Sequence, residues 1–177
     1  MRKIILFLIT AIVTLCPTTL DAKKKIDKSE FIKNWANYEV TTNSVGQNGT
    51  KYLKVWGYGK KVDKAIEQAK KNAVHACLFR GCPGSANARP TPAIFGNQGN
   101  GQVASENFEY FYDFFEENGD YIQFVNVTTD GMPSGQDRRE VKGGYKVAID
   151  VQVMYDNLRE KMKQDGILKN SSGGFTY

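Results

Sequence analysis

The chain has 177 residues, a formal net charge of +5 at pH 7, 41% hydrophobic residues and 24% charged residues. This composition is typical of a globular protein rather than a disordered one, and the length suits one ordinary domain whose core needs no disulfide bonds. The excess of basic residues is too small to indicate a nucleic-acid-binding protein.

The first residues have the layout of a secretory signal peptide. Arg2 and Lys3 precede an uncharged apolar run over residues 4–15, and a polar segment follows as far as Ala22. The apolar run is shorter than the roughly 20 residues that a membrane-spanning helix needs. We therefore predict that residues 1–22 are removed on export and that the mature chain has no transmembrane segment.

Cys16 offers an alternative interpretation of this segment, as a site of lipid attachment. A bacterial lipobox has a small residue directly before the cysteine, but Leu15 occupies that position here. We therefore favour export without lipidation, followed by one domain over residues 23–168.

Two strands are predicted after the first part of the mature chain. Residues 37–45 and 50–58 are rich in β-branched and aromatic residues. Between them lies Asn48-Gly49, a pair that tolerates positive φ and suits a tight turn. The pattern predicts a β-hairpin.

The second strand contains two glycines that resemble part of a phosphate-binding loop. Gly57 and Gly59 are followed by Lys60, Lys61 and Val62, so the third glycine of a dinucleotide-binding fingerprint is missing. We therefore interpret the glycines as a bend that leads into a helix over residues 63–81, which carries a stripe of alanines at helical spacing.

This strand and helix carry a family resemblance. The segment VWGYGKKVDKAIEQAKKNAVHACLFRG resembles the amino-terminal domain of the flagellar assembly protein FlgT and a related family of small envelope lipoproteins. The segment GGYKVAIDVQVMYDNLREKMKQDGI is similar to the late strand and short helix of such domains. The resemblance implies a non-enzymatic envelope domain that contributes to assemblies, and it implies no catalytic residue.

Residues 82–104 form a long segment rich in glycine, proline and asparagine. Its larger apolar residues are Ile94, Phe95 and Val103, too few to build a core. Loops of this length inside a domain are usually mobile or functional. We expect a mobile, partner-binding loop, with a ligand lid as the alternative.

A second helix is predicted from aromatic residues at helical spacing, namely Phe108, Phe111, Tyr112 and Phe115. Tyr110 and Phe114 lie off this stripe, so they are either exposed for a partner or part of a wide core-facing stripe. The partner-binding residues that the sequence suggests are Trp56, Tyr58, Phe95, Tyr110 and Phe114.

The remaining elements complete an α+β fold. Residues 121–129 alternate as a strand does, residues 145–155 form the clearest strand, and a short helix follows over 156–166. Residues 169–177 form a tail without structural signals. We predict a two-layer sandwich in which an antiparallel sheet of about four strands carries two main helices on one face.

The residues that most often carry chemistry are scarce. Cys77 and Cys82 flank the helix end and are either a structural disulfide or two unbonded thiols. His75 is the only histidine, it lies within the predicted helix, and no nucleophile motif accompanies it. The sequence therefore predicts no catalytic site, no metal site and no cofactor.

These features favour an exported bacterial protein, in the periplasm or associated with the outer membrane, that binds envelope proteins and does not bind nucleic acid. Two alternatives remain. One is a small-ligand carrier in which Trp56, Tyr58 and the aromatic helix line a cavity. The other is an exported hydrolase that uses carboxylates, which need no histidine.

Overall fold

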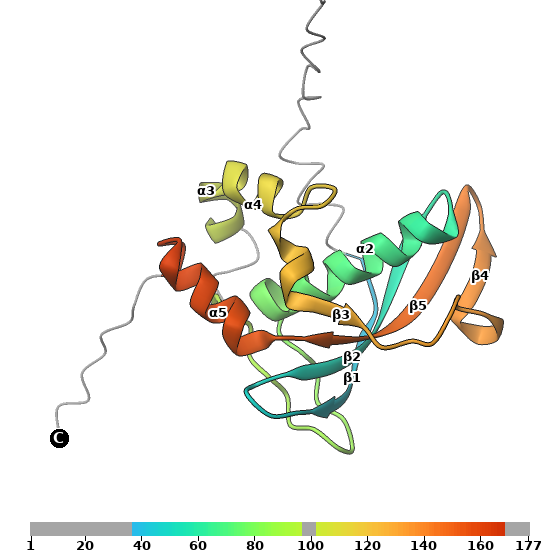
Figure 1. Cartoon of the computed structure of the whole chain (residues 1–177), viewed down its shortest axis with the longest axis horizontal. Coiled ribbons are helices and arrows are strands. Elements are labelled where there is room, and N and C mark those ends of the chain that lie inside the picture. The colour runs from blue at the N-terminus through green and yellow to red at the C-terminus, as the bar shows by residue number, and fades with distance from the viewer. Residues whose placement is uncertain (1–36, 97–101, 169–177) are drawn as a thin grey trace, which may run out of the picture.

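The computed structural model describes residues 37–96 and 102–168, and Figure 1 shows the arrangement of their helices and strands. The predicted signal peptide (1–22), Cys16 and the predicted tail (169–177) lie outside the described residues. The described part is an α+β fold with an antiparallel sheet, as predicted.

Five strands form the sheet, and the longest of them pairs with three neighbours. The order along the main path is β1-β2-β5-β3, and β4 pairs with β5 beyond the end of β3. All pairings are antiparallel. The strands are β1 (Val40–Val45), β2 (Lys51–Gly59), β3 (Val125–Val127), β4 (Arg138–Val141) and β5 (Gly144–Val153).

The predicted hairpin is present between β1 and β2. Asn48 and Gly49 have φ angles of 51° and 67°, the left-handed backbone conformation that the tight turn requires. On its other side, β2 pairs with β5, with Trp56 opposite Ala148 and Tyr58 opposite Lys146. This register decides which side chains share a face of the sheet.

One face of the sheet is covered by a long helical segment, which lies across β2 and β5 in Figure 1. Helix α2 (Val62–His75) continues as a π-helix, η1 (Ala76–Arg80), and Gly81 ends it with a φ of 82°. The predicted alanine stripe faces the sheet and is fully buried. Between helix and sheet the core consists of Ala65, Ala69, Ala73, Leu53, Val55, Val147, Ile149, Val151 and Val153.

The two glycines of β2 allow α2 to lie unusually close to the strand. A Cβ atom on Gly57 would overlap the carbonyl oxygen of Ala65 and lie 2.9 Å from the Cα of Ala69. A Cβ atom on Gly59 would lie 3.0 Å from the Cα of Ala65. Both glycines belong to the strand, so the bend predicted there is wrong. Their function is close packing of helix on strand.

The other helical elements are α3 (Ala104–Glu106), α4 (Phe108–Phe114), η4 (Asp120–Phe124), η5 (Gly135–Asp137) and α5 (Tyr155–Gln164). They extend this layer, except η5, which contacts strands β4 and β5. The aromatic side chains near α4 pack on the end of the long helical segment: the ring of Phe111 lies 4.9 Å from that of Phe79, and the ring of Phe115 lies 6.5 Å from His75. The second predicted helix therefore packs mainly on other helices.

Residues 82–96, the longer of the two described parts of the predicted mobile loop, are anchored to the domain. Cys82 and Thr91 exchange two backbone hydrogen bonds of 2.9 Å. Tyr155 donates its hydroxyl hydrogen to the Pro92 carbonyl at 2.9 Å, and Ile94 and Phe95 are buried in the core. This half of the segment is therefore a packed loop rather than a free one.

Within residues 37–96 and 102–168, no helix combines the length and the apolar character that a membrane span requires.

Candidate binding face

Trp56 and Tyr58 lie on the face of the sheet opposite α2. Successive side chains of a strand point to opposite faces. Because Gly57 and Gly59 face the helix, Trp56 and Tyr58 must point away from it. Tyr58 is 45% exposed, and Trp56 is partly exposed.

Two basic side chains from neighbouring strands stack on these rings. Lys146 of β5 lies opposite Tyr58, and Arg139 of β4 lies opposite Lys146. The Nζ atom of Lys146 is 4.7 Å from the ring centre of Trp56 and 5.5 Å from that of Tyr58. The Cζ atom of Arg139 is 5.6 Å from the ring centre of Trp56. These distances are within the range of cation–π contacts.

We call Trp56, Tyr58, Arg139 and Lys146 the aromatic–basic face. Lys146 also contacts the carboxylate of Glu39 at 2.5 Å, and this hydrogen bond raises the pKa of its ammonium group. Lys146 is therefore charged at neutral pH. Its side chain is only 16% exposed, whereas Arg139 is an exposed residue, so Arg139 is the more accessible of the two cations.

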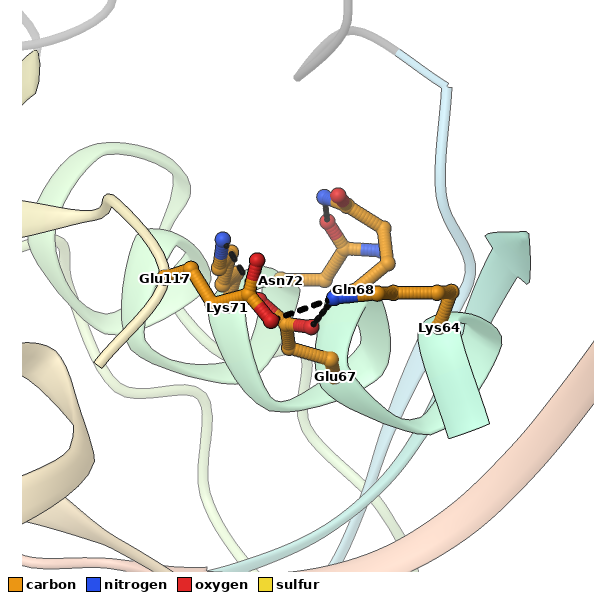
Figure 2. A network of polar contacts seen from close by, with 6 residues as sticks. All are labelled: Lys64, Glu67, Gln68, Lys71, Asn72 and Glu117. Carbon is orange, nitrogen blue, oxygen red and sulfur yellow. Dashed lines mark hydrogen bonds and ion pairs between the residues drawn. The ribbon is translucent and has the colours of Figure 1, made fainter. Parts of the chain in front are cut away.

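A buried amide fixes the backbone at the centre of this face. The side-chain nitrogen of Asn72 on α2 donates to the carbonyl oxygen of Trp56 at 2.8 Å, and Asn72 is only 2% exposed. Gln68 donates in turn to the side-chain oxygen of Asn72 at 2.9 Å, a contact drawn in Figure 2. The helix layer thus holds the strand segment that carries Trp56.

The carboxylates near this amide form ion pairs rather than a catalytic pair. Figure 2 shows that Lys64 contacts both Glu67 and Glu117, and that Lys71 contacts Glu67 as well. Partial burial opposes ionisation of Glu67, but the hydrogen bonds from Lys64 and Lys71 outweigh it and lower the pKa of this carboxyl group. A general acid needs a raised pKa, so Glu67 does not suit the hydrolase alternative.

The other predicted partner-binding residues are placed differently. Phe95 is 9% exposed and Phe114 is 3% exposed, so both belong to the core and are not available to a partner. Tyr110 is partly buried and donates its hydroxyl hydrogen to Asp165 at 2.5 Å, which ties α4 to the end of α5. Of the five predicted residues, Trp56 and Tyr58 share a partly exposed surface.

Cys77 and Cys82, for which the sequence left a disulfide and two unbonded thiols open, lie close together. Both are buried free thiols, and their Sγ atoms lie 3.6 Å apart. Their hydrogen bond raises the pKa of Cys77 and lowers that of Cys82, as expected when the Cys77 thiol donates. The 3.6 Å between the two sulfur atoms is longer than an S–S bond, which is about 2.05 Å long. The disulfide therefore stays a prediction.

His75 has a structural environment. The hydroxyl group of Tyr38 lies 2.8 Å from its Nδ1 atom, and the ring of Phe79 is 4.9 Å away. Burial, together with the positive charge of Arg80, lowers the pKa of His75 to about 3. The imidazole is therefore neutral at physiological pH, and it shares a hydrogen bond with Tyr38.

The structure provides little for the enzyme and carrier alternatives. Among the described residues, no group of three or more His, Cys, Asp or Glu side chains could hold a metal ion. A pocket of about 840 Å³ lies between β1 and the packed loop, lined by Val40, Arg80, Cys82 and several prolines. Phe79 is the one aromatic residue among its described lining, so this is not the aromatic cavity that a carrier would need. Trp56 and Tyr58, which the carrier alternative places in the cavity wall, are not among the described lining residues of this pocket.

Sequence reasoning missed Arg139 and Lys146 as members of the site. The sequence predicts no strand between residues 129 and 145, because β4 is short and exposed along its whole length. The adjacent arginines at 138 and 139 next to the strongest strand were the available signal, but only strand pairing shows that Arg139 reaches Trp56.

Comparison of the chain with known protein families, with curated proteins and with solved structures finds no match.

Proposed function

We propose that this chain is an exported bacterial envelope protein, periplasmic or associated with the outer membrane, that binds other envelope components without catalysing a reaction. The observation that carries the proposal is the aromatic–basic face, where Trp56 and Tyr58 are partly exposed beside Arg139 and Lys146. The signal-peptide layout of residues 1–22 and the resemblance to the FlgT amino-terminal domain support the location. Exposed aromatic residues beside arginine are typical of binding surfaces.

The proposal predicts that a photo-reactive phenylalanine derivative at position 58 captures envelope components in intact cells. The derivative keeps the aromatic character of Tyr58, which is 45% exposed and so accommodates a larger group. After irradiation, the captured products are identified by mass spectrometry.

The matched control places the same derivative at position 160, an exposed site on α5 outside the aromatic–basic face. Capture from position 58 but not from position 160 supports the proposal. If neither position captures anything, and the chain stays unprocessed in the cytoplasm, both the location and the binding role are overturned.

The same proposal has a consequence for the cysteines. In an oxidising compartment, the two thiols of Cys77 and Cys82 are expected to pass two electrons and two protons to a disulfide-bearing oxidant and to form one S–S bond. The 3.6 Å separation of the sulfur atoms requires only a small local shift. A bond that closes so short a loop stabilises the fold by about 2 kcal/mol.

Intact-mass analysis of protein isolated from the envelope, with and without reduction, measures this oxidation. In the unfolded protein, we expect alkylating reagents to modify neither cysteine before reduction and both after it. A Cys82→Ser variant serves as the control, because its remaining thiol at Cys77 should be modified in the unfolded protein without reduction. Wild-type protein that is fully alkylated without reduction would contradict the prediction.

A further inference from the structure

The aromatic–basic face presents two aromatic rings in a row. Trp56 and Tyr58 are two residues apart on one strand, so their Cα atoms are separated by about 6.8 Å along it. The part of an aromatic ring that no cation covers offers an apolar surface on which the C–H groups of a sugar ring can stack. Two neighbouring rings on a sheet can therefore contact consecutive units of a flat polymer.

The charges around these rings are mixed in sign. Lys146 is paired with Glu39 at 2.5 Å, and Lys54, on the same face, is paired with Asp137 at 2.7 Å. A nucleic acid carries a phosphate on every residue and would be repelled by both carboxylates. Sugar hydroxyl groups both donate and accept hydrogen bonds, so a surface with ammonium groups and carboxylates suits them.

Arg139 supplies one cation without a carboxylate partner among residues 37–96 and 102–168. It is exposed, and its guanidinium group stacks on Trp56. A guanidinium group offers a planar pair of donors that matches a carboxylate in bidentate geometry. The face can therefore bind a ligand that carries an occasional carboxylate, which Arg139 would hold next to the aromatic rings.

From these observations we infer that the aromatic–basic face binds a sparsely acidic glycan, with sugar rings stacked on Trp56 and Tyr58 and a carboxylate held by Arg139. This inference rests on the proposed function, for which it names the class of ligand. Cell-wall glycan has this chemistry, since amino sugars alternate with sugars that bear a carboxyl-containing substituent.

Titration calorimetry with three soluble probes tests the inference on the mature chain. The probes are acidic fragments of cell-wall glycan, a neutral chito-oligosaccharide of similar length, and single-stranded oligothymidylate. We expect the acidic fragments to bind best, and the neutral oligosaccharide to bind more weakly because it lacks the contact with Arg139. Raising the salt concentration should reduce this difference, because the contact is ionic.

Two variants assign the contacts. Trp56→Ala removes a stacking ring and should weaken binding of both glycans about tenfold or more. Arg139→Gln should reduce binding of the acidic fragments to the level of the neutral oligosaccharide. Because Arg139 is exposed, this substitution should leave the fold intact. Arg159→Gln on α5 removes the same charge from an exposed site outside the face and should change neither affinity.

The outcomes separate the inference from the proposed function. Absence of glycan binding at millimolar concentrations overturns the inference, and capture of an envelope protein from position 58 would then leave the proposed function standing. Tighter binding of oligothymidylate than of either glycan overturns the inference in favour of a nucleic acid. Equal binding by wild type, Trp56→Ala and Arg139→Gln also overturns it, because the glycan then binds elsewhere.

Discussion

Replacing Gly57 with alanine is expected to lower the free energy of unfolding by about 3 kcal/mol, the upper end of the usual cost of overpacking a core. The added methyl group would overlap the backbone of α2 at Ala65 and Ala69. Backbone atoms in a helix cannot rotate away as a side chain can, so the helix must move off the sheet. Urea denaturation followed by circular dichroism measures the change.

Gly131→Ala is the matched control for this substitution. Gly131 has a φ of 69°, and a Cβ atom there would have no neighbour within 4 Å, so alanine costs only the backbone strain, about 1 kcal/mol. If Gly57→Ala is no more destabilising than Gly131→Ala, the close packing of α2 on β2 does not require the glycines of this strand. A ligand site would then be the better explanation of the Gly-x-Gly pattern.

His75 is expected to make the protein lose stability as the pH falls from 6.5 to 5. Burial and Arg80 lower the pKa of His75 to about 3 in the folded protein, whereas an unfolded histidine titrates near 6.5. The unfolded chain therefore binds a proton that the folded chain does not, and this stabilises the unfolded state below pH 6.5. Over this interval the loss is about 2 kcal/mol.

A His75→Gln variant is the control for this pH dependence. Glutamine cannot titrate, but its side-chain amide, which has both a donor and an acceptor, can still form a hydrogen bond with Tyr38. The free energies of unfolding of both proteins are measured at several pH values from 7 to 5. The wild type should lose about 2 kcal/mol more than the variant. Parallel curves would mean that His75 is protonated in the folded protein.

Much of the fold could be predicted because its signals are local. The Asn48-Gly49 turn needs positive φ, the alternating residues of β5 define a buried face, and the alanine stripe of α2 has helical spacing. β4 could not be predicted in this way, because all four of its residues are exposed and show no alternation of apolar and polar side chains.

The candidate site depended on information that the linear pattern lacks. Phe95 and Phe114 were candidates for a partner surface, but Phe95 stacks 5.3 Å from Phe79 and Phe114 lies 6.1 Å from Phe124. Each contact joins two different predicted elements, so the spacing within one element does not indicate it. Likewise, the direction of Trp56 follows from the helix that lies against Gly57, and the contact with Arg139 follows from the pairing of β4 with β5.

The most direct test of the binding role is the yield of cross-linked product from position 58 relative to position 160 in intact cells. Both variants are compared at equal amounts of processed, exported chain, so that differences in export do not enter the ratio. The aromatic–basic face predicts a high ratio, with the same envelope component captured in each experiment, and a loss of that product when Arg139 is also replaced by glutamine. Equal yields from the two positions, with no reproducible product, would contradict a binding role for this face.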